Sequence, residues 1–337
     1  MADPAASVSQ PRHGGDLAFA TARYGAPSGG WLDLSTGINP TPYPVAKISV
    51  EQLGRLPDAA SLGRLLATAR SAYGVPAGAA LIAVPGTEIA IRLLPFVTPA
   101  GAVAVVGPTY GSHEDAWRSA GRIVAIVRDL DEIPMETGIV VVGNPNNPDG
   151  RTFSRSRLSA LARRLGDRGG LLVVDEAFAD VAPEVSLFPD LAGLPAIVLR
   201  SFGKFYGLAG LRLGFVAGSM QSVEQLGAIL GGWPVSAPAL AIGLEALSND
   251  GWRAATRAGL KEQSAQLRAL LTRHRLAIRG GTDLFVLVED DDATGLHRRL
   301  AGRGIWTRAF PDQPAWLRIG LPGAGVARFD RALSDCR

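Results

Sequence analysis

Lysine is rare in this chain, and one lysine lies in a glycine-rich stretch. The 337 residues include 34 basic ones, of which only Lys47, Lys204 and Lys261 are lysines. Lys204 belongs to the sequence SFGKFYGLAGLRLGF, residues 201–215. Arginine stays protonated, whereas a lysine amine can lose its proton and attack a carbonyl carbon to form a Schiff base. Lys204 is therefore a candidate nucleophile, and a surface charge without a function is the alternative.

The glycine-rich stretch does not match the common phosphate-binding loops. The pattern GxxxxGK[ST] fails because Val198 and Phe205 stand where a glycine and a hydroxyl residue are needed. The dinucleotide spacing G-x-G-x-x-G is also missing, as are a G-x-S-x-G elbow and an H-E-x-x-H helix. A nucleotide switch and a hydrolase thereby lose their main support.

The composition is that of an ordinary globular protein. Hydrophobic residues make up 47% of the chain, which is enough for a sizeable core and one or two domains. The net charge is only +3, with both signs mixed along the sequence, so we expect neither nucleic acid nor a membrane surface as partner. The lone Cys336 gives neither a disulfide framework nor a metal-ligand cluster. Because no apolar targeting or membrane-spanning run is present, we expect a soluble, cytoplasmic protein.

Short apolar runs alternate with helical patterns in the first two thirds of the sequence. The runs cover residues 81–86, 102–108, 138–145, 171–176 and 196–201. Because they are apolar on both faces, they predict buried parallel strands. Between them, Leu158, Leu161 and Leu165 repeat at helical spacing within 154–169. The alternation predicts an α/β fold with a mainly parallel, doubly wound sheet.

The pattern changes beyond GGWPVSAP, residues 231–238, which reads as a hinge. A long helix at about 250–275, another at about 293–303 and several short apolar stretches predict a smaller α+β domain. We therefore expect a large domain at 45–230 and a small C-terminal domain at 231–337.

Chemistry is expected where the predicted strands end, because ligands of such sheets bind beyond the carboxyl ends of the strands. The sequence places four elements at such ends, in this order: NPNNPDG (144–150), VVDEAF (173–178), SFGK (201–204) and GLAGLRLGF (207–215). Together they resemble the fold-type I, aspartate-aminotransferase-like family of enzymes that depend on pyridoxal 5′-phosphate.

The resemblance implies catalytic roles for Lys204 and Asp175. Lys204 would hold the cofactor aldehyde covalently and later carry protons. Asp175 would pair with the pyridinium nitrogen and keep the ring an acceptor of electrons. Asn147 would donate a hydrogen bond to the phenolic oxygen, and Tyr110 would stack on the ring. The alternatives are a turn residue for Asn147 and a core aromatic for Tyr110.

The resemblance also implies a cradle for the cofactor phosphate. Ser201 would supply a hydroxyl and Arg212 a bidentate guanidinium. Gly86, Thr87 and Glu88 would open a helix whose backbone N–H groups face the anion. A plain strand-to-helix turn is the alternative for Gly86.

The substrate residues are expected at both ends of the chain. Arg318 resembles the family arginine that clamps a substrate carboxylate, and Arg308 resembles one that binds the substrate phosphate in histidinol-phosphate aminotransferases and threonine-phosphate decarboxylases. The stretches 13–25 and 32–44 resemble the opening of the cobalamin-pathway decarboxylases. This implies that residues 1–44 form a substrate-contacting segment in which His13 and Asn39 approach a phosphorylated amino acid.

The resemblance is strongest to enzymes that convert L-threonine O-3-phosphate to (R)-1-amino-2-propanol O-2-phosphate in cobalamin biosynthesis. An aminotransferase of the histidinol-phosphate type and a non-catalytic cofactor-binding protein are the alternatives. Phe178 favours the decarboxylase, because most aminotransferases of this fold carry a tyrosine there. Family active sites lie at a subunit boundary, which implies a homodimer. Leu56 stands where relatives often place a tyrosine that reaches the partner's cofactor phosphate, so that contact is left open.

Overall fold

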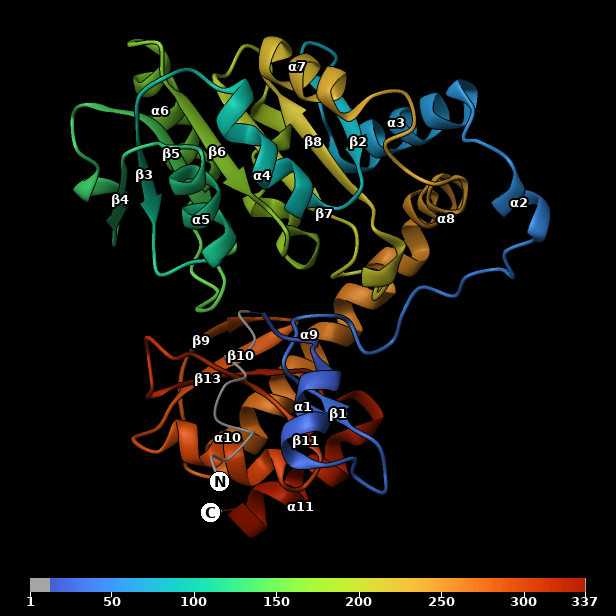
Figure 1. Ribbon diagram of the computed structural model, residues 1–337, viewed down its shortest axis with the longest axis vertical. Helices are drawn as coiled ribbons and strands as arrows, with labels where there is room; N and C mark the ends of the chain where they lie inside the picture. Colours follow the sequence, from blue (N-terminus) through green and yellow to red (C-terminus); the bar gives the residue numbers. More distant parts are fainter. Residues whose placement is uncertain (1–12, 337) are drawn as a thin grey trace, which may run out of the picture. The chain divides into compact units, whose positions relative to one another are not determined.

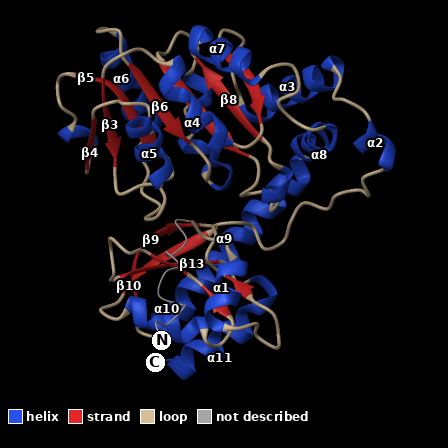
Figure 2. Cartoon of the chain, viewed as in Figure 1, coloured by secondary structure: helices blue, strands red, loops and turns tan. Residues whose placement is uncertain are grey.

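The computed structural model describes residues 13–336, which divide into two compact units (Figures 1 and 2). The larger unit is Pro42–Arg257, and the smaller unit combines residues 13–41 with residues 258–336. The expected large and small domains were placed at 45–230 and 231–337, so the division differs in where residues 13–41 and 231–257 belong.

A seven-stranded sheet forms the centre of the larger unit (Figure 1). Its strands are β2 (Ala80–Val84), β3 (Ala102–Val106), β4 (Val124–Val127), β5 (Thr137–Gly143), β6 (Leu171–Asp175), β7 (Ala196–Ser201) and β8 (Gly214–Gly218). The order across the sheet is β2-β8-β7-β6-β5-β3-β4. β8 is antiparallel to both of its neighbours, and the other pairs are parallel. This confirms the predicted, mainly parallel α/β sheet.

Helices cover both faces of this sheet. The helices of the larger unit are α2 (Val50–Gly54), α3 (Ala59–Tyr73), α4 (Thr87–Val97), α5 (Gly111–Ser119), α6 (Arg155–Gly166), α7 (Met220–Leu230) and α8 (Ala237–Ser248). Neighbouring strand residues such as Val140 and Val141 point to opposite faces, yet both are fully buried. α4, α5 and α7 contribute to one core cluster with β3, β5, β6 and β7.

Two local sequences explain particular helices. In α6 the Ser154 hydroxyl accepts a hydrogen bond from Arg157 N at 3.2 Å, and the predicted repeat Leu158, Leu161 and Leu165 is buried. In α8, Gly243 lies against Leu65 of α3, so α8 packs into the larger unit. Residues 231–257 therefore stay with that unit, and the boundary falls within α9 (Asp250–Arg273).

The smaller unit is built on a four-stranded antiparallel sheet of order β12-β13-β10-β9. Its strands are β9 (Ala277–Thr282), β10 (Phe285–Glu289), β12 (Arg308–Ala309) and β13 (Trp316–Gly320), accompanied by α1 (Leu17–Tyr24), α10 (Ala293–Ala301) and α11 (Val326–Cys336). A separate parallel pair joins β1 (Leu32–Asp33) to β11 (Ile305–Trp306). This pairing attaches the N-terminal residues to the C-terminal part of the chain.

Candidate active site

The Asp175 carboxylate lies at the carboxyl end of β6 and is almost completely buried. Its Oδ1 accepts a hydrogen bond from Ala177 N at 3.0 Å, and its Oδ2 lies 3.0 Å from His113 Nε2. Partners on both oxygens fix the orientation of the carboxylate. A carboxylate held in this way can pair with a protonated ring nitrogen.

His113 is a site residue that the sequence analysis did not identify. It lies on α5, is 1% exposed, and contacts the Tyr110 ring edge to face at 6.1 Å between centroids. The bond to Asp175 joins residues 62 positions apart, so spacing along the chain gives no signal for it. His113 links the residue predicted to stack on the cofactor with the one predicted to bind its nitrogen.

Lys204 lies in the turn after β7 and is half-buried. Aromatic residues hold this turn: Tyr206 stacks on Phe202 at 4.1 Å and on Trp252 at 5.5 Å. The Lys204 carbonyl accepts a hydrogen bond from Gly207 N at 3.3 Å. The backbone that carries the amine is therefore anchored by buried rings.

Three separate segments converge at the start of α4. Gly86 is the N-terminal cap of α4 with a φ of 81°, and a Cβ placed on it would strike the Arg212 guanidinium. Ser201 pairs with Gly214 between β7 and β8, and a Cβ on Gly214 would lie 3.1 Å from Thr87 N. The structure thus brings the predicted phosphate residues together.

The start of α4 is suited to an anion. No side chain caps the helix, its first backbone N–H groups have no acceptor within the helix, and the positive end of the helix dipole lies there. Arg212 adds a positive charge and has a φ of 54°, in the left-handed region that non-glycine residues rarely adopt. Such a strained backbone is typical of functional sites.

Glu88 lies in the first turn of α4, as expected, and its side chain has partners of its own. Its carboxylate accepts hydrogen bonds from Tyr110 OH and from Arg92 Nε, both at 3.0 Å. Burial, together with the charge of Glu88, raises the pKa of Tyr110 to about 12. Tyr110 therefore remains a neutral phenol near neutral pH and keeps a fixed ring orientation.

In the loop 144–150, Asn144 and Asn146 make structural hydrogen bonds and differ from Asn147 in exposure. Asn144 donates to the carbonyls of Phe153 and Val185 at 3.2 Å, and Asn146 donates to Pro108 O at 2.9 Å. Both are fully buried, whereas Asn147 is partly exposed. The first two asparagines hold the loop in shape, and the contact of Asn147 with a cofactor stays a prediction.

These residues fit pyridoxal 5′-phosphate. The larger unit supplies a buried carboxylate at Asp175, a primary amine at Lys204, and an uncapped helix start beside Arg212. The three groups match the ring nitrogen, the aldehyde and the phosphate of that cofactor, respectively.

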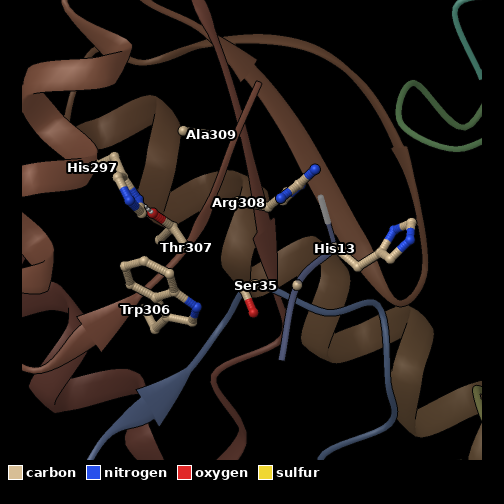
Figure 3. Close-up of a pocket in the computed structure, with 8 residues that line it drawn as sticks. His13, Ser35, His297, Trp306, Thr307, Arg308 and Ala309 are labelled. Carbon is tan, nitrogen blue, oxygen red and sulfur yellow. Dashed lines mark hydrogen bonds between the residues drawn. The ribbon is translucent and has the colours of Figure 1, made fainter. Parts of the chain in front are cut away.

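The smaller unit contains a pocket with two of the predicted substrate residues, His13 and Arg308 (Figure 3). Ser35, His297 and Thr307 also line it, and none of these was identified from the sequence. His297 Nδ1 lies 2.9 Å from Thr307 Oγ1. Burial, with the charges of Arg298 and Arg308, lowers the pKa of His297 to about 4, so this imidazole is neutral at neutral pH.

Arg308 and Arg318 face each other on the neighbouring strands β12 and β13. Arg318 is 7% exposed, and its guanidinium donates to Ser35 O at 2.8 Å. Burial and the charge of Arg308 lower the pKa of Arg318 to about 10, which the charge of Asp33 partly opposes. Two arginines held side by side create a strongly positive place that suits a substrate with two anionic groups.

Three other positions from the sequence analysis, Asn39, Phe178 and Leu56, differ in burial. Asn39 is buried, and its Oδ1 accepts from Thr41 N at 2.9 Å, but it does not line the pocket of His13 and Arg308. Phe178 is buried after β6, whereas Leu56 is exposed in the segment before α3.

Neither a metal site nor a membrane span was found within residues 13–336. No group of three or more His, Cys, Asp or Glu side chains there could hold a metal ion. In the same range, no helix combines the length and the apolar character needed to cross a bilayer.

Comparisons with known proteins show which family the chain belongs to. The family described as aminotransferase class I and II matches residues 59–335. The chain is 44% identical to a threonine-phosphate decarboxylase of Sinorhizobium sp, over 96% of each chain. It is 41% identical to the enzyme of that name from Pseudomonas aeruginosa, over 95% of this chain and 96% of that one.

The fold also occurs in a solved histidinol-phosphate aminotransferase from Clostridium acetobutylicum. The TM-score is 0.79 at 18% identity, covering 90% of this chain and 98% of that one. Enzymes of the matched family depend on pyridoxal 5′-phosphate, which confirms the cofactor expected from the motifs. Since the family match spans most of the sequence and two relatives exceed 40% identity over nearly all of it, the chain belongs to the class I and II aminotransferases.

Proposed function

We propose that this enzyme decarboxylates L-threonine O-3-phosphate to (R)-1-amino-2-propanol O-2-phosphate, a step of cobalamin biosynthesis. The observation that carries the proposal is the pair Arg308 and Arg318, side by side on β12 and β13. The substrate has one carboxylate and one phosphate, so it offers an anion to each arginine. The names of the two relatives above 40% identity support the same substrate.

In the larger unit the proposal assigns Asp175, Lys204 and the start of α4 to the cofactor. When bound, pyridoxal 5′-phosphate supplies an electron sink for the pair released as the bond between the α-carbon and the carboxyl carbon breaks. Asp175 would hold the ring nitrogen protonated, and His113 would keep that carboxylate oriented. Lys204 would deliver a proton to the α-carbon after carbon dioxide leaves.

In the smaller unit the proposal assigns Arg318 to the substrate carboxylate and Arg308, with His13, to the phosphate. Arg318 is already held by Ser35 O and packs its guanidinium 5.1 Å from the centroid of the Phe285 ring, so its direction is set before substrate arrives. Asn39 remains a proposed substrate contact.

A homodimer is also proposed. Residues 45–56, around α2, expose Val45, Val50, Leu53 and Leu56, with 85% of Val50 accessible. So many exposed aliphatic side chains on one short segment suit burial against a second copy. Sedimentation of the purified enzyme should give twice the mass of one chain, and a monomer at micromolar concentration would contradict this part.

Product analysis tests the function. The enzyme loaded with cofactor is mixed with L-threonine O-3-phosphate, and separately with histidinol phosphate and 2-oxoglutarate. We expect carbon dioxide and aminopropanol phosphate from the first mixture and no glutamate from the second. Glutamate formation without carbon dioxide would instead establish the aminotransferase. If neither product forms, both assignments are refuted. The variant Lys204→Ala is the negative control.

A further inference from the structure

A buried ion cluster lies directly next to the cofactor residues in the sequence. Arg200 precedes Ser201 on β7, and Glu176 follows Asp175 at the end of β6. Arg200 donates to Glu176 Oε2 at 2.5 Å and to Asp180 Oδ1 at 2.8 Å. All three charged side chains are at most 2% exposed.

The cluster and the cofactor residues lie on opposite faces of the sheet. Successive residues of a strand point to opposite sides. Arg200 packs against Tyr73 of α3, with its guanidinium 4.8 Å from the ring centroid. Asp175 instead contacts His113 of α5. The side chains that bind the cofactor and those that form the cluster therefore share the same backbone but contact different layers.

The cluster joins the two strand ends tightly. Ser186 Oγ donates to Glu176 Oε2 at 2.7 Å, and Leu187 N donates to Oε1 at 2.6 Å, so the Glu176 carboxylate is held by three donors. In the backbone, Glu176 N donates to Leu199 O at 2.8 Å. A buried arginine between two carboxylates can shift only by breaking strong, poorly solvated contacts.

We infer that Arg200 is a positioning residue for the cofactor site, because its bridge to Glu176 and Asp180 fixes the ends of β6 and β7 relative to each other. The inference rests on the cofactor site proposed above and not on the reaction. The cofactor is a rigid ring whose nitrogen must meet Asp175 while its phosphate and aldehyde meet the residues that follow β7. A small displacement of one strand end therefore weakens the binding of the whole cofactor.

The test measures the dissociation constant of pyridoxal 5′-phosphate from the full-length apoprotein. In Arg200→Lys the charge remains, but one ammonium cannot reproduce the guanidinium fork to two carboxylates. We expect the dissociation constant to rise about tenfold or more, the effect of roughly one lost charge-assisted contact. Glu176→Gln, which keeps the size of the side chain, should raise it in the same direction and serves if Arg200→Lys does not fold.

Arg157 provides a matched control. Its guanidinium also bridges two carboxylates, Asp129 at 2.6 Å and Asp131 at 2.9 Å, but its side chain is 40% exposed, and neither carboxylate is assigned to the cofactor. Arg157→Lys should leave the dissociation constant within about twofold of wild type. An equal effect of both lysine variants would overturn the inference.

A double-mutant cycle distinguishes positioning from general destabilisation. If Arg200 acts through Asp175, Arg200→Lys should weaken cofactor binding much less in an Asp175→Ala background than in wild type. An unchanged dissociation constant in folded Arg200→Lys, or full additivity in the cycle, overturns the inference. Failure of the wild-type apoprotein to bind the cofactor at all would instead refute the proposed cofactor site.

Discussion

Two buried arginines of this protein have opposite electrostatic surroundings. Burial alone would lower the pKa of Arg200, but the charges of Asp180 and Glu176 outweigh it and raise that pKa. Burial and the charge of Arg308 together lower the pKa of Arg318 to about 10, against the opposing charge of Asp33. Both side chains are less than 10% exposed.

The difference separates a structural arginine from one kept for a ligand. The charge of Arg200 is balanced by its own protein, so it contributes to a defined backbone. Burial and the charge of Arg308 disfavour the cation of Arg318, and the two arginines are paired in the register of β12 and β13. An anionic substrate would add a favourable charge beside the two arginines, which is why we propose that they bind it.

The largest expected effect comes from removing the charge of Arg200. Arg200→Met leaves the carboxylates of Glu176 and Asp180 buried without their cation, which should lower the free energy of unfolding by about 3–5 kcal/mol. Chemical denaturation measures this value. Arg157→Met, at the exposed counterpart, should cost less than about 1 kcal/mol. Equal losses in the two variants would remove the contrast between the sites.

The pH dependence of stability tests the burial of His297 beside Arg298 and Arg308 in the smaller unit. The pKa of His297 falls from 6.5 to about 4 on folding, so the unfolded chain binds the proton more readily. The neutral imidazole therefore contributes its full stabilisation above about pH 6.5, and this contribution is lost as the pH falls towards 4, up to roughly 3 kcal/mol. In His297→Gln, the free energy of unfolding should depend less on pH between these values than in wild type, and denaturation at a series of pH values measures this. A wild-type free energy of unfolding that does not change with pH in this range would contradict the lowered pKa of His297.

Replacing Arg318 should affect the kinetics more than the stability, the reverse of what we expect for Arg200. Arg318→Met should lower kcat/KM for the phosphorylated amino acid about 100-fold, as expected for one lost charge-assisted clamp, while the free energy of unfolding changes by less than about 1 kcal/mol. Steady-state kinetics and denaturation on the same preparation measure both. A large loss of stability with unchanged kinetics would make Arg318 a structural residue.

A smaller effect is expected at the phosphate cradle, where a third arginine, Arg212, lies. Gly86→Ala should displace the Arg212 guanidinium and weaken cofactor binding about tenfold. Gly25→Ala is the matched control, because Gly25 has the same φ of 81° but nothing within 4 Å of the new Cβ. Both variants carry the same backbone strain, so only Gly86→Ala should change the cofactor dissociation constant.

The sequence predicted most of the central sheet, because local patterns determine its strands. The apolar runs correspond to β2, β3, β5, β6 and β7, and polar residues follow them as expected. β8 was not identified, because its glycine-rich sequence reads as a loop, although Gly214 is what lets α4 approach. The boundary near residue 230 differs because α8 packs on α3, which no local pattern reports.

Contacts between distant residues limited what the sequence could predict of the site. His113 and Arg200 act through partners that only the strand register and the helix packing bring near. The motif VVDEAF marked Asp175, but Glu176 points to the other face and has a different task. Likewise, Arg308 lies opposite Arg318 only because of the register between β12 and β13.

The most direct test of the account is reduction of the cofactor-loaded enzyme with borohydride, followed by peptide mass analysis. We expect a pyridoxyl adduct on the peptide that contains Lys204 and none on those with Lys47 or Lys261, the other two lysines of the chain. A protein that gains no mass, or that gains it at Lys47 or Lys261, would contradict the account.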